Sequence, residues 1–222
     1  MRSVAFTTSL VAVLLLAAPL VPAAELRASL TDRDLVPVSD TVLILSPVGE
    51  SRSATIPRAA SPPVVMDQIN MQFEPAVLVI PQGAKVTFPN SDSVAHQVYS
   101  FSPAKRFALG LYRGVRHAPV DFEQPGLVVL GCNIHDFMIG YIVVADSPYF
   151  GKTNGAGEVQ ITDLPAGTYT VKAWGPRFKD KEARVLQKIT LRGDDKLTLN
   201  VKLEGSLLPV RGVAGKMKGL RY

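Results

Sequence analysis

The sequence is short of cysteine and histidine, the residues from which most disulfide frameworks and metal sites are built. Its 222 residues include one cysteine, Cys132, and three histidines. A single cysteine excludes an internal disulfide and a four-cysteine zinc site. With 47% hydrophobic and 19% charged residues, the chain has the composition of a folded globular protein. Whatever chemistry Cys132 performs, it performs without a second thiol.

Long apolar runs are also lacking, because only the run from Val11 to Val21 stands out. It follows Arg2 and is too short to span a bilayer, which takes roughly 18 residues or more. Val21 and Ala23 are small residues three and one positions before a possible cleavage point. We therefore expect residues 1–23 to be a signal peptide and the mature protein to be periplasmic, without stable membrane insertion. A lone thiol in an oxidising compartment is open to oxidation unless something occupies it.

Sustained helical periodicity is absent as well. Short β-rich runs are separated by turn residues, and glycine and proline occur 17 times each. This pattern predicts an all-β sandwich protein. The expected strands cover Ala76–Ile80, Ala84–Phe88, Gln97–Phe101, Leu127–Leu130, Tyr141–Ala145, Glu158–Ile161, Tyr169–Trp174, Ala183–Leu191 and Leu197–Leu203.

The net charge of +5 is unevenly distributed. Residues 147–222 carry 14 basic and 7 acidic residues, whereas residues 64–146 carry 5 and 7. The difference predicts two units, with residues 205–222 as a solvated basic tail. Because the basic part has no recognised motif and no interleaved aromatic residues, we expect no nucleic-acid partner.

One short segment concentrates the chemistry. Cys132, His135 and Met138 have the spacing C-x2-H-x2-M between two strand patterns, and His96 lies 36 residues before the cysteine. Two imidazoles, a thiolate and a thioether are the ligands of a type 1 copper site. Three alternatives are an inert buried Cys132, a catalytic pair of Cys132 with His135, and zinc bound by the same ligands. The third histidine, His117, has no ligand-like partner nearby.

These motifs resemble the cupredoxins, the blue copper proteins. The ligand loop has the spacing of the amicyanins, and the chain is most similar to the cupredoxin-like proteins called methylamine utilisation proteins. The resemblance runs from about Phe73 to Val144. It is carried by Phe73-Glu74-Pro75, the turn at Gly83, Val86-Thr87-Phe88, Asn90, Asp92, His96, residues 100–105, Pro125-Gly126 and the cysteine loop.

The resemblance implies a Greek-key β-sandwich that holds one type 1 copper. Its in-plane ligands would be His96, Cys132 and His135, with Met138 as the weak axial ligand. Asn90 would hold the two ligand loops together through hydrogen bonds. The implied role is that of a one-electron carrier or relay rather than an enzyme, with a redox protein such as a cytochrome or a dehydrogenase as partner. Two rival roles are copper binding or delivery, with the metal as cargo, and an interaction module whose copper site is vestigial.

The C-terminal part carries a second resemblance. Asn154–Gly157, the run Glu158–Ile161, Leu164-Pro165-Ala166-Gly167 and Tyr169 are similar to carboxypeptidase-regulatory-like, or transthyretin-like, β-sandwich modules. The two opening strands of such modules are missing before Ser147, but residues 26–45 fit them.

We therefore expect a split sandwich. Residues 24–60 would supply its opening strands and residues 147–204 its remainder, with a cupredoxin domain inserted at residues 64–146. Trp174-Gly175-Pro176 stands where relatives often have Trp-His-Pro. We expect no metal in the sandwich, and a structural or docking role for it.

Overall fold

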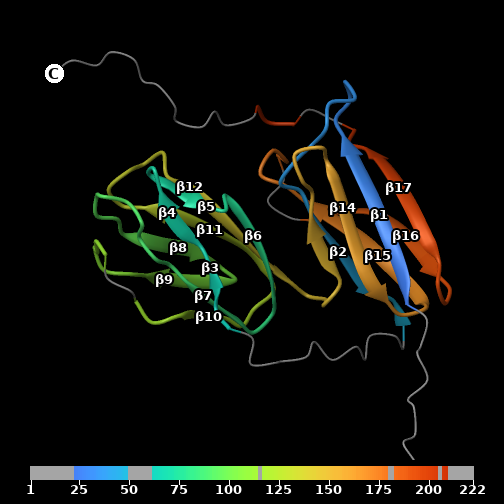
Figure 1. The fold of residues 1–222 in the computed structure, drawn as a ribbon, viewed down its shortest axis with the longest axis horizontal. Coiled ribbons are helices and arrows are strands. Elements are labelled where there is room, and N and C mark those ends of the chain that lie inside the picture. Colours follow the sequence, from blue (N-terminus) through green and yellow to red (C-terminus); the bar gives the residue numbers. More distant parts are fainter. Residues whose placement is uncertain (1–22, 50–61, 115–116, 180–182, 205–206, 210–222) are drawn as a thin grey trace, which may run out of the picture.

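The computed structural model describes residues 23–49, 62–114, 117–179, 183–204 and 207–209. These residues form strands, turns and loops, which confirms the all-β prediction. The part of the chain described here contains no helix that could cross a membrane. Nearly all of the expected signal peptide, and residues 210–222 of the expected tail, lie outside the described residues. Figure 1 shows two groups of strands side by side.

The first group, which we call the middle unit, is a sandwich of strands β3 to β12. A five-stranded sheet has the order β6-β12-β11-β8-β9, a three-stranded sheet has the order β10-β7-β3, and β4 and β5 form a separate hairpin. The sheets enclose a core that includes Val86, Phe122 and Leu130. The strands are β3 (Val64–Val65), β4 (Asp67–Ile69), β5 (Gln72–Glu74), β6 (Val77–Pro81), β7 (Ala84–Thr87), β8 (Val98–Ser102), β9 (Lys105–Ala108), β10 (Val120–Phe122), β11 (Gly126–Cys132) and β12 (Ile139–Ala145).

The second group, the flanking sandwich, combines strands from both ends of the chain. Its sheets have the orders β14-β1-β17 and β13-β2-β15-β16. The blue strands β1 and β2 therefore lie among orange and red ones in Figure 1. Leu26 of β1 pairs with Ile161 on one side and Leu197 on the other. The strands are β1 (Ala24–Thr31), β2 (Val42–Pro47), β13 (Phe150–Lys152), β14 (Glu158–Leu164), β15 (Gly167–Trp174), β16 (Arg184–Leu191) and β17 (Lys196–Lys202).

The two early strands do not form a hairpin with each other, because β1 and β2 belong to opposite sheets. Each lies in the interior of its sheet, so each supplies backbone hydrogen bonds to two neighbours. The chain leaves and re-enters the flanking sandwich at one place. The Leu45 amide donates to the Tyr149 carbonyl at 2.8 Å, and the Ser147 hydroxyl donates to the Leu45 carbonyl at 2.5 Å. The points at which the chain leaves the flanking sandwich and returns to it are therefore adjacent, as expected of the host in a domain insertion.

A small apolar cluster joins the two sandwiches. Val77 and Val143, on the outward face of the five-stranded sheet, pack with Val42 and Trp174 of the flanking sandwich. Strand β12 is consequently buried on both faces towards its end, where the usual alternation of inward and outward residues is lost. The Tyr141 and Trp174 rings lie 5.3 Å apart across this contact. The flanking sandwich thus covers part of the sheet face that the middle unit would otherwise leave to solvent.

The hairpin of β4 and β5 has the two-residue turn Asn70-Met71, since Ile69 pairs with Gln72. Both turn residues have positive φ, 53° and 56°, as a type I′ hairpin turn requires. Phe73 of β5 is buried against Gly140 of β12, where a Cβ would lie 2.8 Å from the Phe73 side chain. The absent side chain at Gly140 therefore lets the hairpin approach the large sheet closely.

We expect the middle unit to be an insert in a split host, and this division predicts how fragments fold. Residues 62–146 expressed alone are expected to fold, because their core is self-contained. Residues 147–222 alone are expected to be unfolded, since both sheets lose an interior strand. Joining residues 24–50 to residue 147 through a short linker should restore one cooperative urea transition, monitored by circular dichroism. Cooperative melting of the 147–222 fragment by itself would contradict the split sandwich.

Candidate metal centre

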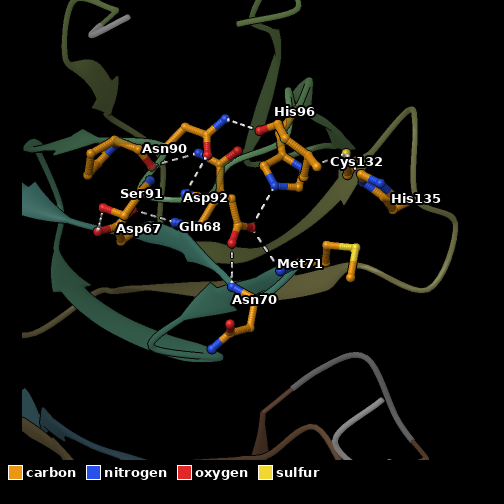
Figure 2. A network of polar contacts seen from close by, with 12 residues as sticks. Asp67, Gln68, Asn70, Met71, Asn90, Ser91, Asp92, His96, Cys132 and His135 are labelled. Atoms are coloured by element: carbon orange, nitrogen blue, oxygen red, sulfur yellow. Dashed lines mark hydrogen bonds and ion pairs between the residues drawn. The ribbon is translucent and has the colours of Figure 1, made fainter. Parts of the chain in front are cut away.

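Three candidate ligands converge at one end of the middle unit. His96 precedes β8, Cys132 is the last residue of β11, and His135 lies on the loop that leads to β12. Their ligand atoms all lie within 4.8 Å of one another. The Sγ atom of Cys132 is 3.7 Å from Nδ1 of His96 and 3.7 Å from Nδ1 of His135 (Figure 2). The structure thus brings together two residues three positions apart and a third from far upstream.

The pairing of two strands produces this convergence. Cys132 of β11 is directly opposite Val98 of β8, so the segment before Val98 passes the end of β11. Along β11, Val128, Leu130 and Cys132 are buried at alternate positions and face the core. Two backbone hydrogen bonds with Tyr112 fix the backbone of His96. The His96 N–H donates to the Tyr112 carbonyl at 3.0 Å, and the Tyr112 N–H donates to the His96 carbonyl at 2.9 Å.

Burial divides the ligands into two kinds. His96 and Cys132 are 0% and 2% exposed, whereas His135 is half-buried. Ile134, directly before His135, and Phe137, two residues after it, are about half exposed, and the rings of His135 and Phe137 lie 5.8 Å apart. The site therefore has an enclosed side and a side that reaches the molecular surface.

The donor set fits a small metal ion of soft or borderline character. An ion bound at about 2.0 Å from nitrogen and about 2.3 Å from sulfur, at a tetrahedral to trigonal angle, holds such donors about 3.5–3.7 Å apart. The observed separations of 3.7 Å match this spacing. The cluster contains no carboxylate, which disfavours magnesium and calcium. Imidazole with thiolate suits copper and zinc.

The other ring nitrogen of His96 also has a partner. Its Nε2 lies 2.8 Å from Oδ2 of Asp92, whose side chain is only 12% exposed. The Asp92 carboxylate accepts two more hydrogen bonds, from the backbone N–H of Asn70 at 2.6 Å and the backbone N–H of Met71 at 2.8 Å. Burial by itself raises the pKa of Asp92, but these hydrogen bonds and the His96 ring outweigh it and lower the pKa below its ordinary value. Asp92 is therefore ionised at neutral pH.

Asn90 has a different arrangement from the one expected. Its side-chain amide donates to the carbonyl oxygens of Val94 and Tyr112, both at 3.0 Å, and its oxygen accepts from the Asp92 amide at 3.0 Å. Among the described residues, none of its side-chain hydrogen bonds reaches the loop that carries Cys132 and His135. Asn90 therefore shapes the loop before His96 instead of joining the two loops.

The hydrogen bonds that do join the two ligand loops come from the residue after the cysteine. The Asn133 amide donates to the Gln97 carbonyl at 3.2 Å, and the Asn133 side chain donates to the Gln97 side chain at 3.0 Å. Neither residue was expected at the site from its sequence context. The only signal is that each of the two residues directly follows a candidate ligand.

Met138 and His117 differ in their relation to the site. Met138 is 1% exposed and belongs to the core of the middle unit, and its amide donates to the His135 carbonyl at 2.9 Å. Its role as a ligand stays a prediction. His117 is not part of the three-residue cluster, and its ring packs edge-on against Tyr112 with centroids 4.5 Å apart.

Comparison with known proteins identifies similar solved structures. No protein-family model matches the chain, and no curated protein does. A variant of amicyanin in its reduced state is 25% identical over 39% of this chain and 88% of its own, with a TM-score of 0.34. A purple cupredoxin from Nitrosopumilus maritimus is 26% identical over 38% and 100%, with a TM-score of 0.31. A copper-containing nitrite reductase from Thermus scotoductus is 25% identical over 53% and 28%, with a TM-score of 0.37.

Proposed function

We propose that this chain is an exported type 1 copper protein that carries single electrons between partner proteins. One copper ion would be bound by His96, Cys132 and His135, with Met138 as a weak fourth ligand. The observation that carries the proposal is the equal 3.7 Å separation of the Cys132 sulfur from one nitrogen of each histidine. When bound, copper supplies a one-electron couple between Cu(II) and Cu(I).

The residues of the chain would keep the site nearly unchanged between the two oxidation states. Thiolate and thioether favour Cu(I), and imidazole also suits Cu(II), so the set is a compromise. His96 and Cys132 are held by strand pairing and by hydrogen bonds from buried positions. A rigid, dry ligand set has little to rearrange when its charge changes, which favours fast electron exchange.

His135 provides the route to a partner. It is the ligand that reaches the surface, and the exposed side chains of Ile134 and Phe137 lie beside it. An apolar surface around a half-exposed ligand suits transient docking of another redox protein, such as a cytochrome or a dehydrogenase. The leader expected at residues 1–23 would place this encounter in the periplasm.

The burial of two ligands argues against copper delivery as the main role. Handing an ion to an acceptor requires the acceptor's ligands to replace those of the donor one by one. Here His96 and Cys132 are almost inaccessible, so only His135 is open to such exchange. Electron transfer has no such requirement, because the ion stays in place.

The first prediction tests the ligand set. Wild-type protein with one equivalent of Cu(II) should show a strong visible absorption band from thiolate-to-copper charge transfer, and Cys132→Ser should abolish the band, because a hydroxyl is a poor substitute for a thiolate. His117→Gln is the control and should keep the band, since His117 lies outside the cluster. Visible and electron paramagnetic resonance spectra provide the measurement. A colourless one-to-one complex of the wild type would rule out a type 1 site.

The second prediction concerns the axial position. Met138→Leu should keep the colour and raise the reduction potential, because loss of a donor disfavours Cu(II). Met66→Leu is a matched control, since Met66 is a second fully buried methionine of the same core. Voltammetry of both variants measures the potentials. Equal shifts in the two variants, or no shift in either, would assign Met138 to core packing alone.

The third prediction separates a carrier from a delivery protein. Reduced protein mixed with an oxidised cytochrome should transfer its electron within the stopped-flow time range and keep its copper. Replacement of the exposed Phe137 by Lys should slow this reaction severalfold without changing the colour, because the apolar docking surface is interrupted. Metal analysis after the reaction gives the copper content of each protein. Copper transfer to an apo acceptor without electron exchange would favour the delivery role.

A further inference from the structure

Two aspartates connect the β4–β5 hairpin with the loop before His96. Asp67, on the hairpin, accepts hydrogen bonds from the amide and the hydroxyl of Ser91, at 3.2 and 2.7 Å. Asp92, on the loop, accepts from the two amides of the hairpin turn. Only Asp92 also contacts a candidate ligand, through Nε2 of His96 (Figure 2). The two carboxylates thus make comparable structural links, but they differ in their relation to the site.

The geometry around Asp92 indicates which nitrogen of His96 carries the proton. Each oxygen of the Asp92 carboxylate already accepts a backbone N–H of the hairpin turn, so the carboxylate acts as an acceptor and Nε2 of His96 is the donor in the 2.8 Å contact. A neutral imidazole has one N–H, which leaves Nδ1 with a free lone pair. Nδ1 is the atom that faces the Cys132 sulfur at 3.7 Å. The ring is therefore in the tautomer and the orientation that metal binding through Nδ1 needs.

The hairpin turn also holds the Asp92 carboxylate in place. Asn70 and Met71 are consecutive residues with left-handed backbone, and their two amides donate to different oxygens of the same carboxylate. Left-handed backbone is readily adopted by asparagine but is unfavourable at a residue such as methionine. The Asp92 carboxylate compensates for this cost by accepting the Met71 amide. Unfavourable backbone conformations held in this way are concentrated at functional sites.

We propose that Asp92 is a positioning residue that fixes the tautomer and ring orientation of His96 before a metal ion binds. The second half of the inference rests on the copper function proposed above. With the ion bound, the charged acceptor on Nε2 makes the imidazole a stronger donor through Nδ1. A stronger nitrogen donor favours Cu(II) over Cu(I) and so lowers the reduction potential.

The test compares Asp92→Ala with Asp67→Ala. Nitrogen chemical shifts of the histidine rings in the apo protein report the tautomer, and voltammetry of the copper-loaded protein reports the potential. In the wild type, His96 should be entirely in the Nε2–H form. Asp92→Ala should populate both tautomers and weaken Cu(II) binding about 10- to 100-fold. If Cu(I) binding is unaffected, each tenfold loss raises the potential by about 59 mV.

The control variant distinguishes positioning from a general structural effect. Asp67→Ala removes hydrogen bonds between the same hairpin and the same loop but leaves His96 untouched. It should lower the thermal midpoint of the apo protein and leave the tautomer and the potential unchanged. Equal changes in tautomer and potential in both variants would overturn the proposal, as would an Nδ1–H tautomer in the wild type.

A milder variant covers the case in which Asp92→Ala does not fold. Asp92→Asn keeps an oxygen that accepts from His96 but removes the charge, so the Nε2–H tautomer should persist while the potential rises by less. A potential equal to that of the wild type would contradict a role for the charge. The tautomer measurement needs no metal, so it decides the positioning role even if the wild type fails to form a coloured copper complex. In that case the proposed function is wrong, independently of Asp92.

Discussion

The site depends on the register of one short strand contact. Cys132 is opposite Val98, and from this pairing His96 reaches the end of β11 although it is 36 residues earlier in the sequence. A shift of one residue would turn Cys132 away from the core and towards the opposite face of the sheet. The register is specified because Val128 and Leu130 on the same strand must face a buried core. Hydrophobic packing therefore determines where the thiol lies, and hydrogen bonds then refine the two imidazoles.

The candidate ligands lie outside the apolar cluster that joins the two units. The flanking sandwich packs against Val143 and Tyr141 of β12, on the outward face of the large sheet. His135 and the exposed Phe137 lie on the loop before β12 begins. Because the two sandwiches share this apolar contact, the flanking sandwich supports the sheet that carries Cys132.

The sequence predicted the local motifs well and the hydrogen bonds between distant loops poorly. The all-β class followed from short runs of strand-forming residues, and the loop of Cys132 and His135 followed from its spacing. The β4–β5 hairpin was missed because its strands have three residues each and its turn has methionine in a left-handed conformation, which no turn rule favours. Asp92 belonged to the recognised pattern, but its role requires amides about twenty residues away. Periodicity carries no information about such contacts.

The two histidines of the cluster are therefore not equivalent. His96 is fully buried, has its second nitrogen bonded to a charged carboxylate and is fixed along its backbone by Tyr112. His135 is half-buried on a loop whose neighbouring side chains face solvent. A site that must hold an ion firmly and still exchange electrons with another protein needs both kinds of ligand. In the proposed carrier, the buried histidine would keep the ion in place and set its preference between oxidation states, and the half-buried one would bring the ion close to a docked partner. The proposed division of roles is supported by the burial of the two rings and by their hydrogen bonds, and it would account for the carboxylate beside His96, the ring that a docked partner cannot reach.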